Sequence, residues 1–179
     1  MTGPLTPSYA VLFLCSGNSS RSLIAEALLA HLGGGRFRAC SAGSHPSGFV
    51  HPLARAMIEE MHLPTDNMRS KSWDEFTRPS APRLDFIFTL CDAAAGETCP
   101  QWPGQPVTAH WGIEDPGLRG GSPQSRRRAF EQATLQIKRR IELFLSLPLA
   151  SLDSLTLQRA LDEIGRLPRA IDGDDELTS

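Results

Sequence analysis

An apolar run, a short polar loop and a helical pattern near the start of the chain constrain its fold most. Residues 9–14 are apolar and typical of a buried strand, and residues 23–29 continue with helical periodicity. Between them lies Cys15-Ser16-Gly17-Asn18-Ser19-Ser20-Arg21-Ser22. A turn from a strand into a helix aims backbone N–H groups and the positive end of the helix dipole at one spot. The sequence therefore predicts an anion-binding loop.

Two side chains of this loop are candidates for substrate binding and nucleophilic attack. Arg21 offers a planar guanidinium group that can bind a tetrahedral oxyanion through two N–H groups. The same field favours the thiolate form of Cys15, which is the nucleophilic form. A cysteine at a strand end is more often simply buried, but the Cys-x5-Arg spacing between a strand and a helix favours a nucleophile. The loop lacks the endings of a nucleotide P-loop and of a dinucleotide-binding turn.

Strand and helix patterns alternate along the chain, which indicates an α/β fold with a parallel sheet. Strands are predicted at 9–14, 37–41, 84–90 and 107–110, and helices at 22–32, 52–61, 122–145 and briefly after the capping-box sequence Ser72-Trp73-Asp74-Glu75. We expect a four-stranded parallel open sheet flanked by helices on both faces. Ligands of such sheets bind at the carboxyl ends of the strands. Because Cys15 and Cys91 both end predicted strands, they could face one crevice.

The length of 179 residues suits one domain with a full core. The expected division is a flexible N-terminus (1–8), a catalytic domain (9–147), a helical extension (148–168) and a disordered acidic tail (169–179). The extension contains an apolar stripe on a helix predicted over 151–167, formed by Leu152, Leu155, Leu161 and Ile164. We expect this stripe to pack on the chain's own domain rather than on a partner.

Composition excludes several classes of function. The formal net charge of −2 gives no electrostatic reason to expect nucleic acid as a partner, and the run Arg126-Arg127-Arg128 is interpreted as a solvated helix face. No stretch approaches the roughly 20 apolar residues of a membrane span. The first residues lack the layout of a signal peptide. We therefore expect a cytoplasmic protein with neither nucleic-acid nor membrane partners.

The chain has four cysteines, Cys15, Cys40, Cys91 and Cys99. In a cytosolic protein, reactive or buried thiols are more common than permanent disulfides. The spacing of the cysteines does not suit a zinc site, so no metal is expected. Cys91 and Cys99 bracket a small segment with a central glycine, which favours a redox pair over two unrelated thiols.

A second motif, His110-Trp111-Gly112-Ile113-Glu114-Asp115-Pro116-Gly117, contains a candidate general acid. Proline keeps Asp115 extended and fixes a loop. Asp-Pro is often only a turn, but a positioned aspartate beside a nucleophilic loop can protonate a leaving oxygen.

These residues together resemble the arsenate reductases built on the low-molecular-weight tyrosine phosphatase fold, which is a Rossmann-like three-layer fold. The resemblance covers about residues 9–145. Besides the loop, the matching segments are Ala25-Glu26-Ala27, Ser41-Ala42-Gly43, Arg69-Ser70-Lys71-Ser72, Thr89-Leu90-Cys91-Asp92, Cys99-Pro100 and the motif ending at Pro116.

The resemblance implies a role for each site residue. Arsenate would bind in the loop formed by Ser16, Gly17, Asn18, Ser19, Ser20, Arg21 and Ser22. Cys15 would attack arsenic while Asp115 protonates the departing oxygen. Ser22 would help to keep Cys15 as thiolate, and Asn18 would hold the shape of the loop.

The resemblance also implies a thiol relay and its electron donor. Cys91 would attack Cys15 and release arsenite, and Cys99 would then attack Cys91. A thioredoxin or a glutathione/glutaredoxin system would reduce the resulting disulfide, and no cofactor would remain bound. Asn18, Glu26 and Ser41 match a potassium site of some relatives, but Lys71 stands where an acidic ligand would be, which implies no required potassium. Cys40 is expected to be a buried strand thiol.

Two other functions use parts of the same site. A low-molecular-weight phosphotyrosine phosphatase would need Cys15, Arg21 and Asp115 but not the cysteine pair, and it usually carries aromatic residues after the Asp-Pro sequence, where this chain has Gly117-Leu118. A non-catalytic sensor would bind arsenic through cysteines and would not need Asp115.

Overall fold

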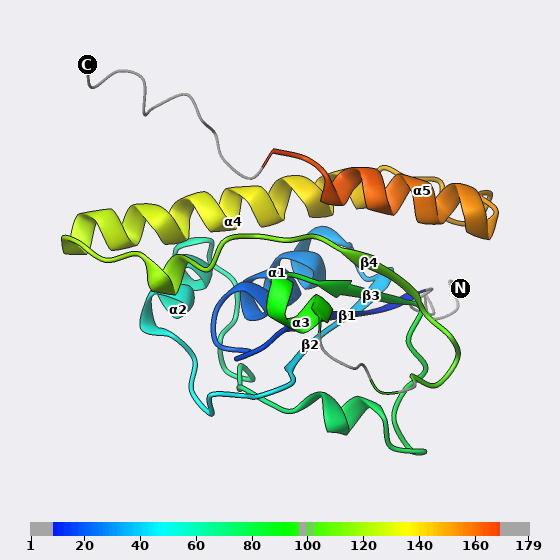
Figure 1. Ribbon diagram of the computed structural model, residues 1–179, viewed down its shortest axis with the longest axis horizontal. Helices are drawn as coiled ribbons and strands as arrows, with labels where there is room; N and C mark the ends of the chain where they lie inside the picture. The colour runs from blue at the N-terminus through cyan, green and yellow to red at the C-terminus, as the bar shows by residue number, and fades with distance from the viewer. Residues whose placement is uncertain (1–8, 97–99, 101, 169–179) are drawn as a thin grey trace, which may run out of the picture.

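The computed structural model describes residues 9–96, 100 and 102–168. In chain order its strands and helices are β1 (Tyr9–Cys15), α1 (Arg21–Leu32), β2 (Phe37–Gly43), α2 (Pro52–Glu60), the 3-10 helix η1 (Trp73–Phe76), β3 (Phe86–Thr89), α3 (Asp92–Gly96), β4 (Val107–His110), the 3-10 helix η2 (Pro116–Leu118), α4 (Pro123–Leu145) and α5 (Ser154–Gly165). Figure 1 shows α4 and α5 lying along one side of the molecule, above the sheet.

The four strands form one parallel sheet in the order β2-β1-β3-β4, as predicted. Strand β1 lies between β2 and β3. Its residues 11–15 are almost fully buried, because both faces of the sheet are covered. Leu14 is paired with Thr89 of β3. The carboxyl ends of β1 and β3 therefore lie side by side.

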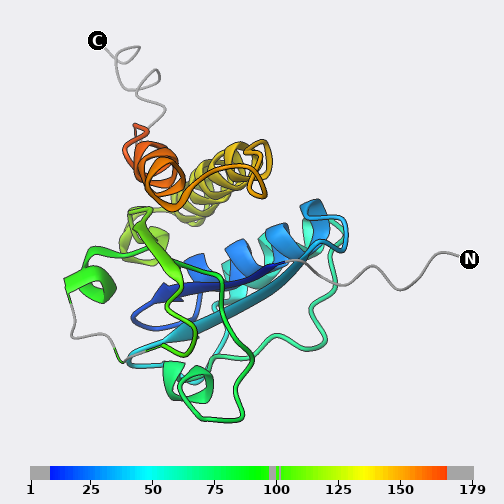
Figure 2. The ribbon, with the colours of Figure 1, turned by 90° about the vertical axis from the view of Figure 1, so that its right-hand side faces the viewer.

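The two faces of the sheet are covered differently. One face packs against α1, α2, α4 and α5 in a large apolar cluster that includes Phe13, Phe88 and Phe144. The other face packs in a smaller cluster against η1 and loop residues, and the buried members of this cluster include Leu12 and Phe76. Figure 2 shows this arrangement, with α1, α4 and α5 on one side of the sheet and the short η1 helix on the other.

Helix α5 packs closely against the end of the sheet. Trp111 follows β4, is 1% exposed, and donates a 3.0 Å hydrogen bond from Nε1 to the carbonyl of Leu161. The buried side chains of α5 are Leu157, Leu161 and Ile164. The expected stripe was wrong at one position, since Leu155 is 63% exposed and Leu157 takes its place. The helix begins only at Ser154, capped by Asp153. Leu157, Leu161 and Ile164 share one face because they are spaced four and three residues apart, whereas Leu155 lies six residues before Leu161 and on another side of the helix.

One expected helix cap is confirmed and another forms only in part. Ser122 caps α4 by accepting a hydrogen bond from the Ser125 N–H, with proline at the first helical position. The capping box at Ser72 forms only in part. Ser72 accepts a hydrogen bond from the Asp74 N–H, whereas the Glu75 carboxylate binds Arg69 and does not bond to the backbone N–H of Ser72.

No helix in the described part of the chain has the length and apolar character needed to cross a membrane.

Candidate active site

The loop between β1 and α1 has its carbonyl groups directed outward. The carbonyls of Ser16, Gly17 and Ser19 each accept a 2.9 Å hydrogen bond from a backbone N–H of the segment 45–51. In a trans peptide the N–H points opposite to the C=O. The N–H groups that follow these three carbonyls therefore point to the inner side of the loop, which is the arrangement that binds an anion.

The thiol of Cys15 lies at the bottom of this loop and is 3% exposed. Its Sγ is 2.9 Å from Ser22 Oγ, and Asn18 Nδ2 donates a 2.8 Å hydrogen bond to the same hydroxyl. Because Ser22 Oγ accepts from Asn18, its own hydrogen is free to point at the sulfur. Ser22 Oγ can therefore donate a hydrogen bond to the Cys15 sulfur.

Asn18 fixes the shape of the loop. It is fully buried, and its backbone has a left-handed conformation with φ of 45°, which asparagine tolerates better than most residues. Its Oδ1 accepts a 2.9 Å hydrogen bond from the Lys71 N–H. Gly43, at the end of β2, supports the loop from behind, and a Cβ atom there would come within 2.5 Å of the Ser16 carbonyl oxygen.

Arg21 connects this loop to the Asp-Pro loop. Its Nη1 donates a 2.8 Å hydrogen bond to the Ile113 carbonyl, and its Nη2 lies 3.5 Å from Asp115 Oδ2. Its Nε is buried and has no hydrogen-bond partner among the described residues. Only part of the guanidinium group therefore remains for an oxyanion in this arrangement, and a bound oxyanion would satisfy the Nε donor.

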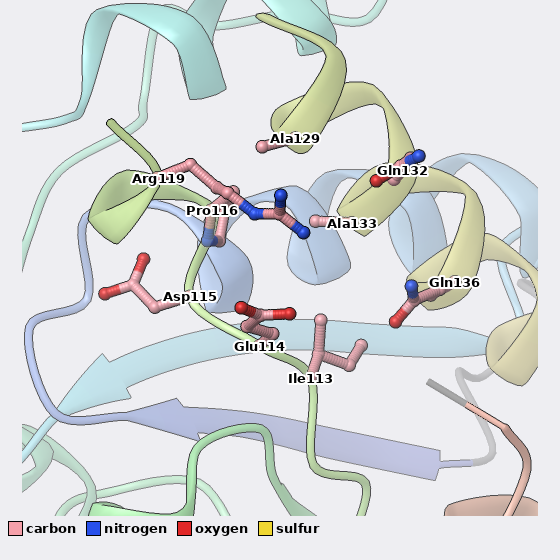
Figure 3. Close-up of a pocket in the computed structure, with 9 residues that line it drawn as sticks. All are labelled: Ile113, Glu114, Asp115, Pro116, Arg119, Ala129, Gln132, Ala133 and Gln136. Carbon is pink, nitrogen blue, oxygen red and sulfur yellow. The ribbon is translucent and has the colours of Figure 1, made fainter. Parts of the chain in front are cut away.

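The contacts of Asp115 are compatible with both interpretations of the Asp-Pro sequence. Its Oδ1 accepts a 2.9 Å hydrogen bond from the Gly117 N–H and so begins η2 as a turn residue would, while Oδ2 faces Arg21. In Figure 3 Asp115 points toward the loop between β1 and α1, whereas Arg119 lies on the opposite side, over Ala133 of α4. The cavity of about 30 Å³ on the Arg119 side holds about one water molecule and is too small for a substrate.

The structure brings Cys91 to the same place. The Leu90 N–H donates to the Leu14 carbonyl across β1 and β3, so Cys91 follows beside the loop. Its sulfur accepts hydrogen bonds of 3.3 Å from the Ser16 N–H and from the Ala94 N–H. Cys15, Cys91 and Ala94 form a buried cluster. Cys99 lies outside the described residues.

His51 is a neighbour of the site that the sequence did not reveal. Its backbone N–H donates to the Ser19 carbonyl, and its Nδ1 accepts a hydrogen bond from the Leu53 N–H as the cap of α2. The ring packs against Phe130, with centroids 4.6 Å apart. Burial lowers the pKa of His51, and the nearby Asp115 carboxylate opposes this shift. A single histidine before a proline gave no pattern that would have identified it.

Lys71 lies among the residues that resemble a potassium site. Its ammonium group is 3.4 Å from Ser41 Oγ, and Ser41 donates a 3.1 Å hydrogen bond to the Glu26 carboxylate. Burial raises the pKa of Glu26 and lowers the pKa of Lys71, and the opposite charge of each partly offsets the shift of the other. Burial also raises the pKa of the nearby Cys40 thiol to about 11.

No group of three or more His, Cys, Asp or Glu side chains in the described ranges is arranged to hold a metal ion. The site instead combines a buried thiol, an anion-binding loop, an arginine and an aspartate at the carboxyl ends of parallel strands. This combination is typical of cysteine-dependent enzymes that act on tetrahedral oxyanions.

Comparison with known proteins agrees with this class. The sequence model of the family described as low molecular weight phosphotyrosine protein phosphatase matches residues 10–158. The chain is 32% identical to an arsenate reductase of Oceanobacillus iheyensis over 75% of this chain and 93% of the relative. It is 33% identical to a glutaredoxin arsenate reductase of Synechocystis sp. over 74% of this chain and 92% of the relative.

A solved structure shows the same fold. The thioredoxin-dependent arsenate reductase of Corynebacterium glutamicum is 27% identical, with a TM-score of 0.56, over 82% of this chain and 65% of that one. The chain therefore belongs to the low molecular weight phosphotyrosine protein phosphatase family, and these relatives within it are arsenate reductases.

Proposed function

We propose that this protein reduces arsenate to arsenite by a thiol relay that starts at Cys15. The observation that carries the proposal is the position of Cys91, whose sulfur lies 3.3 Å from the backbone N–H of Ser16 in the anion-binding loop. A phosphatase of this kind needs one thiol at the loop, whereas a two-electron reduction needs two thiols that can form a disulfide. The relatives named arsenate reductase support the same reaction.

The first step is attack on arsenic. Arsenate binds to the inward N–H groups of the loop formed by residues 16–22, with Arg21 Nε as a further donor. The Cys15 thiolate attacks arsenic, and one arsenate oxygen leaves as water after Asp115 gives it a proton. The 3.5 Å distance between Asp115 Oδ2 and Arg21 Nη2 supports this role, because it keeps the carboxyl group beside the loop.

The second step moves two electrons to arsenic. The Cys91 thiolate attacks Cys15 Sγ, the Cys15–Cys91 disulfide forms, and the sulfur–arsenic bond breaks. The electron pair of that bond stays with arsenic, which goes from As(V) to As(III) and leaves as arsenite, while the two thiols are oxidised. The buried cluster of Cys15, Cys91 and Ala94 supports this step because the two thiols start close together.

An external thiol system returns the enzyme to its reduced state. Cys99 attacks Cys91, which forms a Cys91–Cys99 disulfide and releases the Cys15 thiolate, and either a thioredoxin or a glutathione/glutaredoxin system reduces this disulfide. The thioredoxin-dependent and glutaredoxin-type relatives support both donors as candidates. No bound cofactor takes part.

The test measures arsenite released from arsenate by the purified protein, with each reductant system supplied in parallel. We expect multiple turnovers with one donor and none for Cys91→Ser. Cys40→Ser is the matched control, since Cys40 is half-buried on β2 and outside the relay. Release of phosphate from a phosphotyrosine analogue that is independent of Cys91, without any arsenite, would instead identify a phosphatase.

The Asp115→Asn variant separates the enzyme from a sensor. A sensor would bind arsenate and arsenite without using a proton donor, so its response would not depend on this substitution. For the reductase we expect arsenate binding to persist while turnover falls by about 10²-fold or more, which is the usual contribution of general acid catalysis.

A further inference from the structure

His110 bridges three elements around Cys91. It ends β4, and its Nε2 lies 2.9 Å from Asp92 Oδ1 at the start of α3, while its Nδ1 lies 2.8 Å from Thr89 Oγ1 on β3. A carboxylate only accepts hydrogen bonds, so Nε2 donates to Asp92. In the neutral ring Nδ1 then accepts from the Thr89 hydroxyl.

The position of α3 matters because this short helix completes the surroundings of the Cys91 sulfur. Asp92 follows Cys91 directly, and the Ala94 N–H in the same turn donates a 3.3 Å hydrogen bond to Cys91 Sγ. The Ser16 N–H donates from the loop side at the same distance. The sulfur is therefore held between two backbone donors, one fixed by the loop and the other dependent on where the first turn of α3 lies.

The backbone of His110 cannot move easily. Gly165 of α5 lies directly against it, and a Cβ atom at Gly165 would come within 2.2 Å of the His110 carbonyl oxygen. The Trp111 N–H donates a 2.8 Å hydrogen bond to the Thr89 carbonyl, which joins the ends of β3 and β4. His110 is thus a fixed point from which the imidazole reaches the more exposed Asp92.

We propose that His110 is a positioning residue for the second thiol. By holding Asp92, it fixes the first turn of α3, keeps the Ala94 N–H directed at Cys91, and presents the Cys91 sulfur to Cys15. This inference rests on the proposed function, since it concerns the step in which Cys91 attacks. His110 touches neither the oxyanion loop nor Asp115 in the described contacts, so it acts on the second step and not on substrate binding.

The experiment compares His110→Ala, His110→Gln and Asp92→Ala with the wild-type protein. Loss of one exposed hydrogen bond of this kind corresponds to about a fivefold effect. We expect the single-turnover rate of arsenite release, measured without external reductant, to fall about fivefold in His110→Ala and in Asp92→Ala. The glutamine variant keeps an N–H donor that can reach Asp92, so it should recover most of the rate.

Two measurements distinguish positioning from general damage. Phosphate is a tetrahedral oxyanion that should compete with arsenate for the loop, and its inhibition constant should stay unchanged in all three variants. The double variant His110→Ala/Asp92→Ala should be no slower than either single variant, because the two side chains act through one contact.

Several outcomes would overturn the inference. They are an unchanged rate in His110→Ala, a faster rate, a glutamine variant as slow as the alanine variant, or a phosphate inhibition constant that weakens together with the rate. A wild-type protein that releases no arsenite would instead refute the proposed function itself, so the two failures are distinguishable.

Discussion

Shortening one buried leucine of α5 tests whether the C-terminal helix is part of the domain core. Leu161 is fully buried, and its carbonyl accepts the Trp111 indole hydrogen bond. Substitution of a buried leucine by alanine costs about 2–5 kcal/mol, depending on the cavity that remains. With no exposed surface at Leu161, we expect the free energy of unfolding to fall by about 3 kcal/mol.

A matched control lies on the same helix. Leu155 is 63% exposed, so Leu155→Ala should change the free energy of unfolding by less than about 0.5 kcal/mol. For a chain of this length, 1 kcal/mol corresponds to about 2–4 °C in Tm. Leu161→Ala should therefore lower Tm by about 6–12 °C, while Leu155→Ala leaves it within about 2 °C.

Circular dichroism during heating and in urea measures both variants against the wild-type protein. A single shifted transition for Leu161→Ala would show that α5 unfolds together with the rest of the domain. The reasoning is refuted if Leu161→Ala unfolds at the wild-type temperature, or if Leu155→Ala is destabilised as strongly as Leu161→Ala.

Three further predictions follow from single positions. Gly43→Ala should lower kcat/KM for arsenate about tenfold or more, because its Cβ would displace the Ser16 carbonyl; unchanged kinetics would contradict this. Burial lowers the pKa of His51, so protonation favours the unfolded chain and stability falls as pH drops below about 6.5. His51→Asn, which keeps a cap acceptor, should lose less stability than wild type between pH 7 and 5 in urea titrations; an equal loss would count against the assignment. Exchanging sodium for potassium should change neither Tm nor turnover, because the Lys71 ammonium lies 3.4 Å from Ser41 Oγ; a rise specific to potassium would disprove this.

Local chemistry made the first strand, its loop and the following helix predictable. The apolar run at 9–14 predicts a buried strand, and the small polar residues after it predict a loop, without knowledge of any distant contact. The same holds for the cap of α4. Ser122 accepts a hydrogen bond from a backbone N–H of the first turn, and Pro123 has no N–H that needs a partner. The parallel sheet followed from the alternation of strands and helices.

Contacts between distant residues could not be predicted in the same way. The pairing of β1 with β3, which places Cys91 beside the loop, depends on the strand order β2-β1-β3-β4 and not on any local pattern. Glu75 does not complete the capping box, because the Glu75 carboxylate accepts two hydrogen bonds from Arg69.

The C-terminal helix links the stability of the chain to the geometry of the site. Trp111 stacks on Phe88 with ring centroids 3.8 Å apart and binds Leu161 through its indole N–H, so it joins β3 to α5. Two residues later the Ile113 carbonyl accepts the Arg21 hydrogen bond, and Asp115 follows. A substitution that loosens α5 should therefore act on the Asp-Pro loop through Trp111, and Leu161→Ala should slow turnover even at temperatures where the protein remains folded.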